Sequence, residues 1–125
     1  MTNVQERHGD EQYAYLTTTG RSSGRPHEIE IWFAPVGDRI YLMNGGGESG
    51  APGQSDWVQN LRNDPVATVR IADRQYRGRA RFVDIDSDEH EEARRLLVEK
   101  YQPGAGDLSD WRDSAFPVVI DLMRE

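Results

Sequence analysis

The fold rests on the stretch Leu16-Thr17-Thr18-Thr19-Gly20-Arg21-Ser22-Ser23-Gly24-Arg25-Pro26. Its β-branched threonines predict a strand, and the glycines and serines that follow them predict a tight turn. Such a turn gathers backbone N–H groups, hydroxyl groups and two guanidinium groups, which suits a phosphate or another anion. Composition alone slightly favours the plainer interpretation, a solvated hairpin turn.

The length and composition indicate one domain with one modest core. The chain has 125 residues, of which 36% are hydrophobic, and its mean hydropathy is -0.80. A bound aromatic cofactor or a subunit interface would complete so thin a core. We expect residues 1–12 to form a flexible N-terminal arm and residues 13–125 to form the single domain.

The charge balance and the missing residue types argue against several functions. Fifteen Lys and Arg against 22 Asp and Glu give a net charge of -7, which disfavours nucleic-acid binding. The absence of cysteine excludes disulfides and thiolate catalysis and fits the cytoplasm. The polar N-terminus predicts neither a signal peptide nor stable membrane insertion. His8, His27 and His90 have no metal-ligand spacing, so no metal site is expected.

The hydrophobic pattern predicts a mainly β protein with flanking helices, an α+β chain. Without regular βαβ alternation, the sheet should be mostly antiparallel. One helix is expected after Ser55, with Asn63-Asp64-Pro65 as its end, and a second is capped by Asp86 or Ser87 and runs to Tyr101. Trp111 is expected in a short helical segment. Glycine-rich or Pro/Gly loops are expected over 44–54 and 102–107. The expected strands are Tyr13–Thr19, His27–Ala34, Arg39–Met43, Val66–Ile71, Gln75–Asp84 and Phe116–Leu122.

A series of short motifs, in order, resembles the deazaflavin-dependent nitroreductase family, over roughly residues 14 to 122. These are FMN-binding-like split β-barrel reductases that use coenzyme F-420. The motifs are Leu16-Thr17-Thr18-Thr19-Gly20-Arg21, Ser23-Gly24, Pro26, Trp32-Phe33, Asp38-Arg39, Asn44-Gly45-Gly46, Trp57, Asn60-Leu61, Pro65-Val66, Trp111 and Phe116-Pro117-Val118-Val119.

The resemblance implies a cofactor site with an anionic end and a ring end. Arg21, Ser23 and Gly24 would line the anionic end. Asn44, Gly45 and Gly46 would approach the ring or its side chain, and Trp57 and Asn60 would face the cofactor. Core packing explains Trp57 about as well as ring contact.

The chain departs from the family where the family commonly places cations. Ser22 and His27 stand at two such positions within the expected site, and Asn44 stands at a third. Arg25 is the expected replacement for one lost charge. The alternating residues Arg77, Arg79 and Arg81, with Arg70 nearby, form another candidate, although a solvated face explains them better.

The implied activity is hydride transfer from reduced coenzyme F-420 to a small electrophile such as a quinone, an enone or a nitro compound. Tyr101 is the candidate proton donor. The alternatives are an FMN-dependent reductase, a non-catalytic flavin- or deazaflavin-binding protein, and an interaction domain with an empty barrel. A homodimer is a possible assembly. Members of the family often carry a longer N-terminal extension, which is not expected in this sequence. Membrane attachment through such an extension is therefore not expected either.

Overall fold

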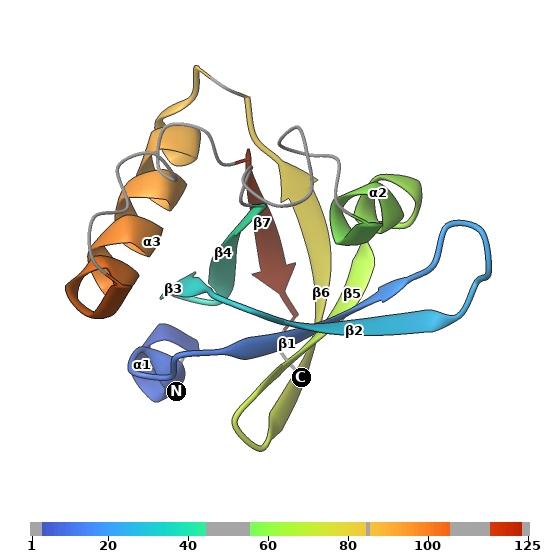
Figure 1. Ribbon diagram of the computed structural model, residues 1–125, viewed down its shortest axis with the longest axis horizontal. Coiled ribbons are helices and arrows are strands. Elements are labelled where there is room, and N and C mark those ends of the chain that lie inside the picture. Colours follow the sequence, from blue (N-terminus) through green and yellow to red (C-terminus); the bar gives the residue numbers. More distant parts are fainter. Residues whose placement is uncertain (1–3, 45–55, 85, 106–115, 124–125) are drawn as a thin grey trace.

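A computed structural model describes residues 4–44, 56–84, 86–105 and 116–123 (Figure 1). Seven antiparallel strands form one curled sheet in the order β2-β1-β5-β6-β7-β4-β3, which confirms the expected mainly β, antiparallel architecture. The strands are β1 (Ala14–Thr19), β2 (Pro26–Ile31), β3 (Ala34–Val36), β4 (Arg39–Asn44), β5 (Val66–Ile71), β6 (Arg74–Phe82) and β7 (Phe116–Leu122). The helices are α1 (Val4–His8), α2 (Asp56–Asn63) and α3 (Asp88–Ala105).

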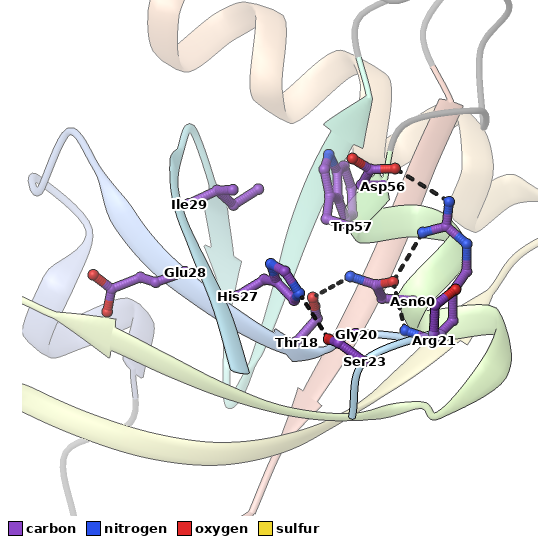
Figure 2. A pocket seen from close by; sticks show the side chains of 11 residues that line it. Thr18, Gly20, Arg21, Ser23, His27, Glu28, Ile29, Asp56, Trp57 and Asn60 are labelled. Carbon is purple, nitrogen blue, oxygen red and sulfur yellow. Dashed lines mark hydrogen bonds and ion pairs between the residues drawn. The ribbon is translucent and has the colours of Figure 1, made fainter. Parts of the chain in front are cut away.

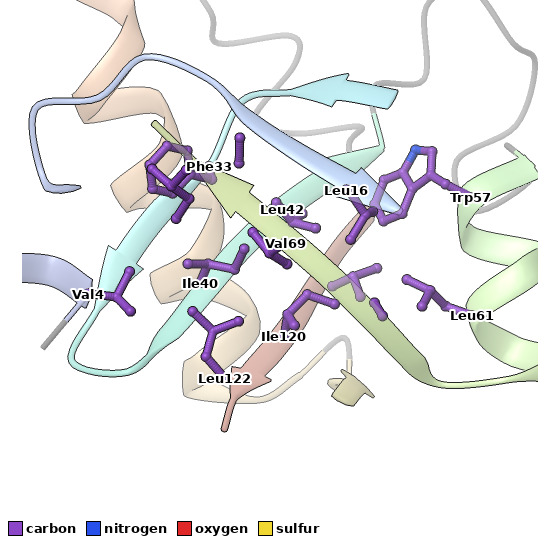
Figure 3. Packing of buried hydrophobic residues seen from close by; sticks show 14 of the residues in the cluster. Val4, Leu16, Phe33, Ile40, Leu42, Trp57, Leu61, Val69, Ile120 and Leu122 are labelled. Atoms are coloured by element: carbon purple, nitrogen blue, oxygen red, sulfur yellow. The ribbon is translucent and has the colours of Figure 1, made fainter. Parts of the chain in front are cut away.

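The curled sheet encloses the main core because its strands alternate between buried and outward side chains. In β1, Leu16 and Thr18 are buried while Thr17 and Thr19 are half-buried on the other side. Helix α2 adds its apolar face to this core. Figure 3 shows Trp57 and Leu61 of α2 beside residues of the sheet.

Strand β7 holds the two parts of the sheet together. It pairs with β4 on one side and with β6 on the other, although β4 and β6 are far apart in the sequence. Ile120 faces the main core, while its neighbour Val119 faces the opposite side. Both faces of this part of the sheet are therefore buried.

Helix α3 covers the outer face of β3, β4 and β7. Ser87 caps its N-terminus, because the Ser87 Oγ accepts the N–H of His90 at 3.1 Å. Ala93, Leu97 and Tyr101 then pack against Tyr41 and Val119 of the sheet. Within the described residues, no helix has the length and apolar character needed to cross a membrane.

The structure differs from the sequence expectation in three places. The expected strand His27–Ala34 is divided into β2 and β3 by a break at residues 32–33. Residues 4–8 of the expected flexible arm form α1, whose Val4 and His8 are 3% and 4% exposed. The third helix continues into the expected loop as far as Ala105.

Candidate functional site

A cavity of about 420 Å³ opens between the β1–β2 turn, the start of β2 and α2 (Figure 2). Both polar and apolar side chains form its wall. Its lining residues are Thr18, Gly20, Arg21, Ser22, Ser23, His27, Glu28, Ile29, Asp56, Trp57 and Asn60. The cavity therefore brings together six of the residues that the sequence assigns to the site: Arg21, Ser22, Ser23, His27, Trp57 and Asn60.

The turn between β1 and β2 is closed by its own backbone. Gly20 N–H donates to the Arg25 carbonyl at 2.8 Å, and Gly24 N–H donates to the Gly20 carbonyl at 2.9 Å. Gly24 has a φ of 70°, in the left-handed region that favours glycine. Within the described residues, the backbone N–H groups of Ser22 and Ser23 have no acceptor. The turn thus leaves two adjacent donors beside the cavity.

Gly20 allows the turn to fold back closely on itself. A Cβ at this position would lie 2.6 Å from both the Ser23 Oγ and the His27 Nε2. Those two atoms are themselves 3.5 Å apart. A glycine here therefore lets both polar side chains gather at the cavity wall.

Asn60 ties the turn to α2. Its side chain is only 3% exposed, and its Nδ2 donates to the Thr18 Oγ1 at 3.1 Å. Its Oδ1 accepts the backbone N–H of Arg21 at 3.1 Å and the Arg21 guanidinium at 3.0 Å. A buried amide with all these partners fixes the position of Arg21 relative to the helix.

The Arg21 guanidinium has a second partner on the same helix. Its Nη2 lies 3.2 Å from the Asp56 Oδ1. The Arg21 and Asp56 side chains are 41% and 89% exposed. An ion pair this accessible to water contributes on the order of 0–1 kcal/mol to stability.

The cavity has fewer positive charges than a strongly anionic ligand would favour. Arg21 and His27 stand on its wall with the carboxylate of Asp56, while the Glu28 carboxylate points away from them (Figure 2). In sequence, residues 45–55 contain one glutamate and neither lysine nor arginine. Binding of an anion here depends mainly on Arg21 and on backbone donors.

The opposite part of the wall is apolar. Trp57 is 9% exposed and belongs to the main core, yet it also lines the cavity. Ile29 of β2 lies across from it in Figure 2. Core packing and contact with a planar ring, the two interpretations of Trp57 from sequence, are therefore compatible.

Other residues assigned to the site from sequence lie elsewhere. Gly24 and Arg25 belong to the same turn but do not line the cavity. The backbone of Asn44 ends β4 opposite Phe116. Gly45 and Gly46 lie outside the described residues, as does Trp111.

Tyr101, the predicted proton donor, does not line the cavity. Its hydroxyl oxygen accepts the Phe33 N–H at 3.0 Å and donates toward the Gln12 carbonyl at 2.7 Å. Its ring stacks on Trp32 with 4.3 Å between centroids. Burial raises the pKa of Tyr101 to about 12. This geometry argues against the proton-donor role and makes Tyr101 an anchor between α3 and the sheet.

Four further lining residues were not predicted from the sequence as part of the site: Thr18, Glu28, Ile29 and Asp56. The strand alternation contains a signal for Ile29, since it places Ile29 on the same face as His27. Asp56 and Asn60 are four residues apart on α2, a spacing that puts both on one face of a helix. Their joint contact with Arg21 becomes visible only when the turn is placed against that helix.

The arginines on β6 do not join the cavity. Arg81 pairs with Asp121 at 2.8 Å and with Glu89, which links β6 to β7 and α3. Arg70 of β5 lies 4.2 Å from the centroid of the Tyr15 ring. These contacts give Arg81 and Arg70 partners within the protein, away from the cavity.

Solved structures share the curled sheet and its helices, and they define a split β-barrel fold. One F420-H2 dependent reductase is 22% identical and matches 89% of this chain and 93% of its own, with a TM-score of 0.67. An F420 reductase is 17% identical and matches 96% and 93%, with a TM-score of 0.66. A protein solved as a domain-swapped dimer is 23% identical and matches 89% and 79%, with a TM-score of 0.69.

The sequence itself gives the family. Residues 2–123 match the F420H(2)-dependent quinone reductase family, and the chain belongs to that family. It is therefore an oxidoreductase of a class that uses reduced coenzyme F-420, which confirms both the resemblance and the expected cofactor.

Proposed function

We propose that the chain transfers a hydride from reduced coenzyme F-420 to a quinone, with enones and nitro compounds as related substrates. The cavity beside the β1–β2 turn would hold the coenzyme. Its anionic part would lie at Arg21 and the turn, and its ring would lie toward Trp57.

The observation that carries this proposal is that Arg21 lines the same cavity as Ser22 and Ser23, whose backbone N–H groups have no acceptor within the described residues. Adjacent backbone donors and a guanidinium form a cradle for phosphate oxygens. A Cβ at Gly20 would crowd that cradle, so the glycine fits a site where a ligand comes close to the backbone. The apolar side at Trp57 and Ile29 fits a flat ring.

In this proposal the protein binds and orients, and the coenzyme supplies the hydride. The hydride carries two electrons to the quinone, which is reduced while the coenzyme is oxidised. One further proton completes the hydroquinone. Because the Tyr101 hydroxyl is engaged by Gln12 and Phe33, we assign that proton to solvent.

A cytoplasmic location is also part of the proposal. It is supported by the absence of cysteine, which fits a reducing compartment.

The test is titration of the protein with coenzyme F-420, with FMN as comparison, followed by quinone reduction monitored through coenzyme oxidation. Arg21→Ala should weaken coenzyme binding about tenfold, at the lower end for a charge-assisted hydrogen bond because the side chain is part-exposed. Arg25→Ala removes the same charge from the same turn, outside the cavity, and should change affinity by less than about twofold.

Equal losses in the two variants would point to a general charge effect and reject the assignment of Arg21. Failure of the wild-type protein to bind coenzyme F-420 would reject the proposed site and activity. Thermal melts of both variants confirm that each is folded.

We also propose a homodimer, with the outer face of the β2-β1-β5-β6 part of the sheet as its interface. Side chains on this face form rows across the strands, and all are exposed or half-buried. Glutamates stand on β2, and an arginine stands three strands away on β6. One row is Glu28, Thr17, Thr68 and Arg77, and the next is Glu30, Tyr15, Arg70 and Gln75.

A two-fold axis parallel to the strands, between β1 and β5, would place β2 of one copy over β6 of the other. Glutamates would then face arginines in both halves of the interface. Light scattering should show a dimer that Arg77→Glu weakens and that the double exchange Glu28→Arg, Arg77→Glu restores. A monomeric wild-type protein would reject this assembly.

A further inference from the structure

Helix α2 presents two different oxygen acceptors to one guanidinium. Asp56 and Asn60 lie four residues apart and so share a face of the helix. The Arg21 Nη1 donates to the Asn60 Oδ1 at 3.0 Å, and the Arg21 Nη2 donates to the Asp56 Oδ1 at 3.2 Å (Figure 2). Each terminal nitrogen of the Arg21 guanidinium therefore donates one hydrogen bond to α2.

These two acceptors differ in how firmly they are held. Asn60 is buried and has a further bond to Thr18, so its oxygen stays in place. The Asp56 side chain is 89% exposed and its carboxylate can turn into water at little cost. Of the two bonds to Arg21, the one from Asp56 is the replaceable one.

The bond between Asp56 and Arg21 matters for anion binding, because Arg21 is the only arginine or lysine that lines the cavity in the described part of the chain. The Asp56 carboxylate takes one of the two N–H donors of Nη2, so an anion that approaches Nη2 meets that carboxylate. An incoming phosphate therefore meets a cation that is already neutralised.

We propose that Asp56 competes with the anionic part of the ligand for Arg21 and so sets the affinity of the site. On binding, the phosphate oxygens take the Nη2 donor and the Asp56 carboxylate moves to solvent. This inference rests on the proposed function for the identity of the natural ligand. The competition itself applies to any phosphate.

The opposite role for Asp56 would be to hold Arg21 ready for the ligand. The two roles predict opposite signs for one substitution. If Asp56 competes, Asp56→Asn tightens anion binding. If Asp56 positions Arg21, the same change weakens it.

The experiment compares the wild-type protein with Asp56→Asn and with Asp73→Asn as the matched control. Both variants remove one negative charge, but Asp73 is exposed in the β5–β6 turn and does not line the cavity. Inorganic phosphate is titrated while NMR follows the amide signals of Ser22 and Ser23, and coenzyme F-420 is titrated separately.

Asp56→Asn should bind both ligands roughly two- to fivefold more tightly, the range expected when one exposed ion pair is removed. Asp73→Asn should differ from wild type by less than about twofold, because its charge is distant and screened. Adding Arg21→Ala to Asp56→Asn should abolish the gain, since the competition acts through that guanidinium.

Unchanged or weaker binding by Asp56→Asn would overturn the inference, as would a gain that survives the loss of Arg21. So would the absence of both phosphate and coenzyme binding in every variant. Tighter phosphate binding by Asp56→Asn in a protein that does not bind coenzyme F-420 would reject the proposed function and leave this inference standing.

Discussion

At Gly20 the backbone passes so close to Ser23 and His27 that a single methyl group would touch both. We expect Gly20→Ala to push these two side chains away from the cavity wall. Both are exposed and can move, so the melting temperature should change little while coenzyme affinity falls several-fold. Thermal melts and coenzyme titration measure the two effects separately.

Gly78 provides the matched control. A Cβ there would lie 2.6 Å from the Ile120 Cγ2 and 3.2 Å from the Asp121 carbonyl, in the packed sheet. Gly78→Ala should therefore lower the free energy of unfolding by about 1–3 kcal/mol and leave the affinity of the folded protein unchanged. A stability loss at Gly20 as large as that at Gly78 would contradict this division.

Individual site residues were predictable to the extent that each depends on local sequence. The turn glycines and Arg21 stand in one short stretch, so sequence reasoning found them. Asp56 was missed because its partner Arg21 comes from another element. The setting of Tyr101 was not predictable, because a phenol in sequence does not reveal that backbone groups of Gln12 and Phe33 bind its hydroxyl.

At the scale of the elements, Tyr101 is expected to anchor helix α3 to the sheet, and one substitution tests this role. Tyr101→Phe removes the hydroxyl that accepts the Phe33 N–H and donates to Gln12. Leaving those buried groups unpaired should lower the free energy of unfolding by about 1–3 kcal/mol. Denaturant unfolding measures this change. The rate of quinone reduction at saturating coenzyme should stay within about twofold of wild type, whereas a large loss of rate would restore the proton-donor role.

The strands followed from sequence wherever their side chains alternate regularly. The division between β2 and β3 was missed because Ile29, Ile31 and Phe33 continue the alternation without a Gly or Pro signal. Helix α1 was missed because Val4 is the only apolar residue among its five, so the sequence has no apolar periodicity there. Such features depend on tertiary contacts, which local propensity does not contain.

Stability of the whole molecule should depend on pH through one lysine and two tyrosines. Burial lowers the pKa of Lys100 from 10.5 to about 8, although Asp10 and Glu11 oppose the shift, and its Nζ donates to the Phe33 carbonyl at 2.9 Å. Between pH 8 and 10.5 the unfolded chain keeps this proton and the folded protein does not, so stability rises with pH.

The tyrosines act in the opposite direction at higher pH. Burial raises the pKa values of Tyr41 and Tyr101 from 10.0 to about 12. Above pH 10 the unfolded chain loses these protons first, so stability falls. Denaturant unfolding from about pH 7 to about pH 11 should show a maximum near pH 10. In Lys100→Met the rise toward that maximum should disappear, and a rise that persists would exclude Lys100 as its source.

The position of β7 also affects how the chain folds while it is being synthesised. Strands β1, β2, β5 and β6 can pair as soon as they leave the ribosome, and so can β3 with β4. These two groups have no common neighbour until β7 inserts between β6 and β4. Translation proceeds from the N-terminus, so the edges of β4 and β6 stay open until residues 116–122 emerge. During that interval the nascent chain offers two unpaired strands to chaperones or to neighbouring chains.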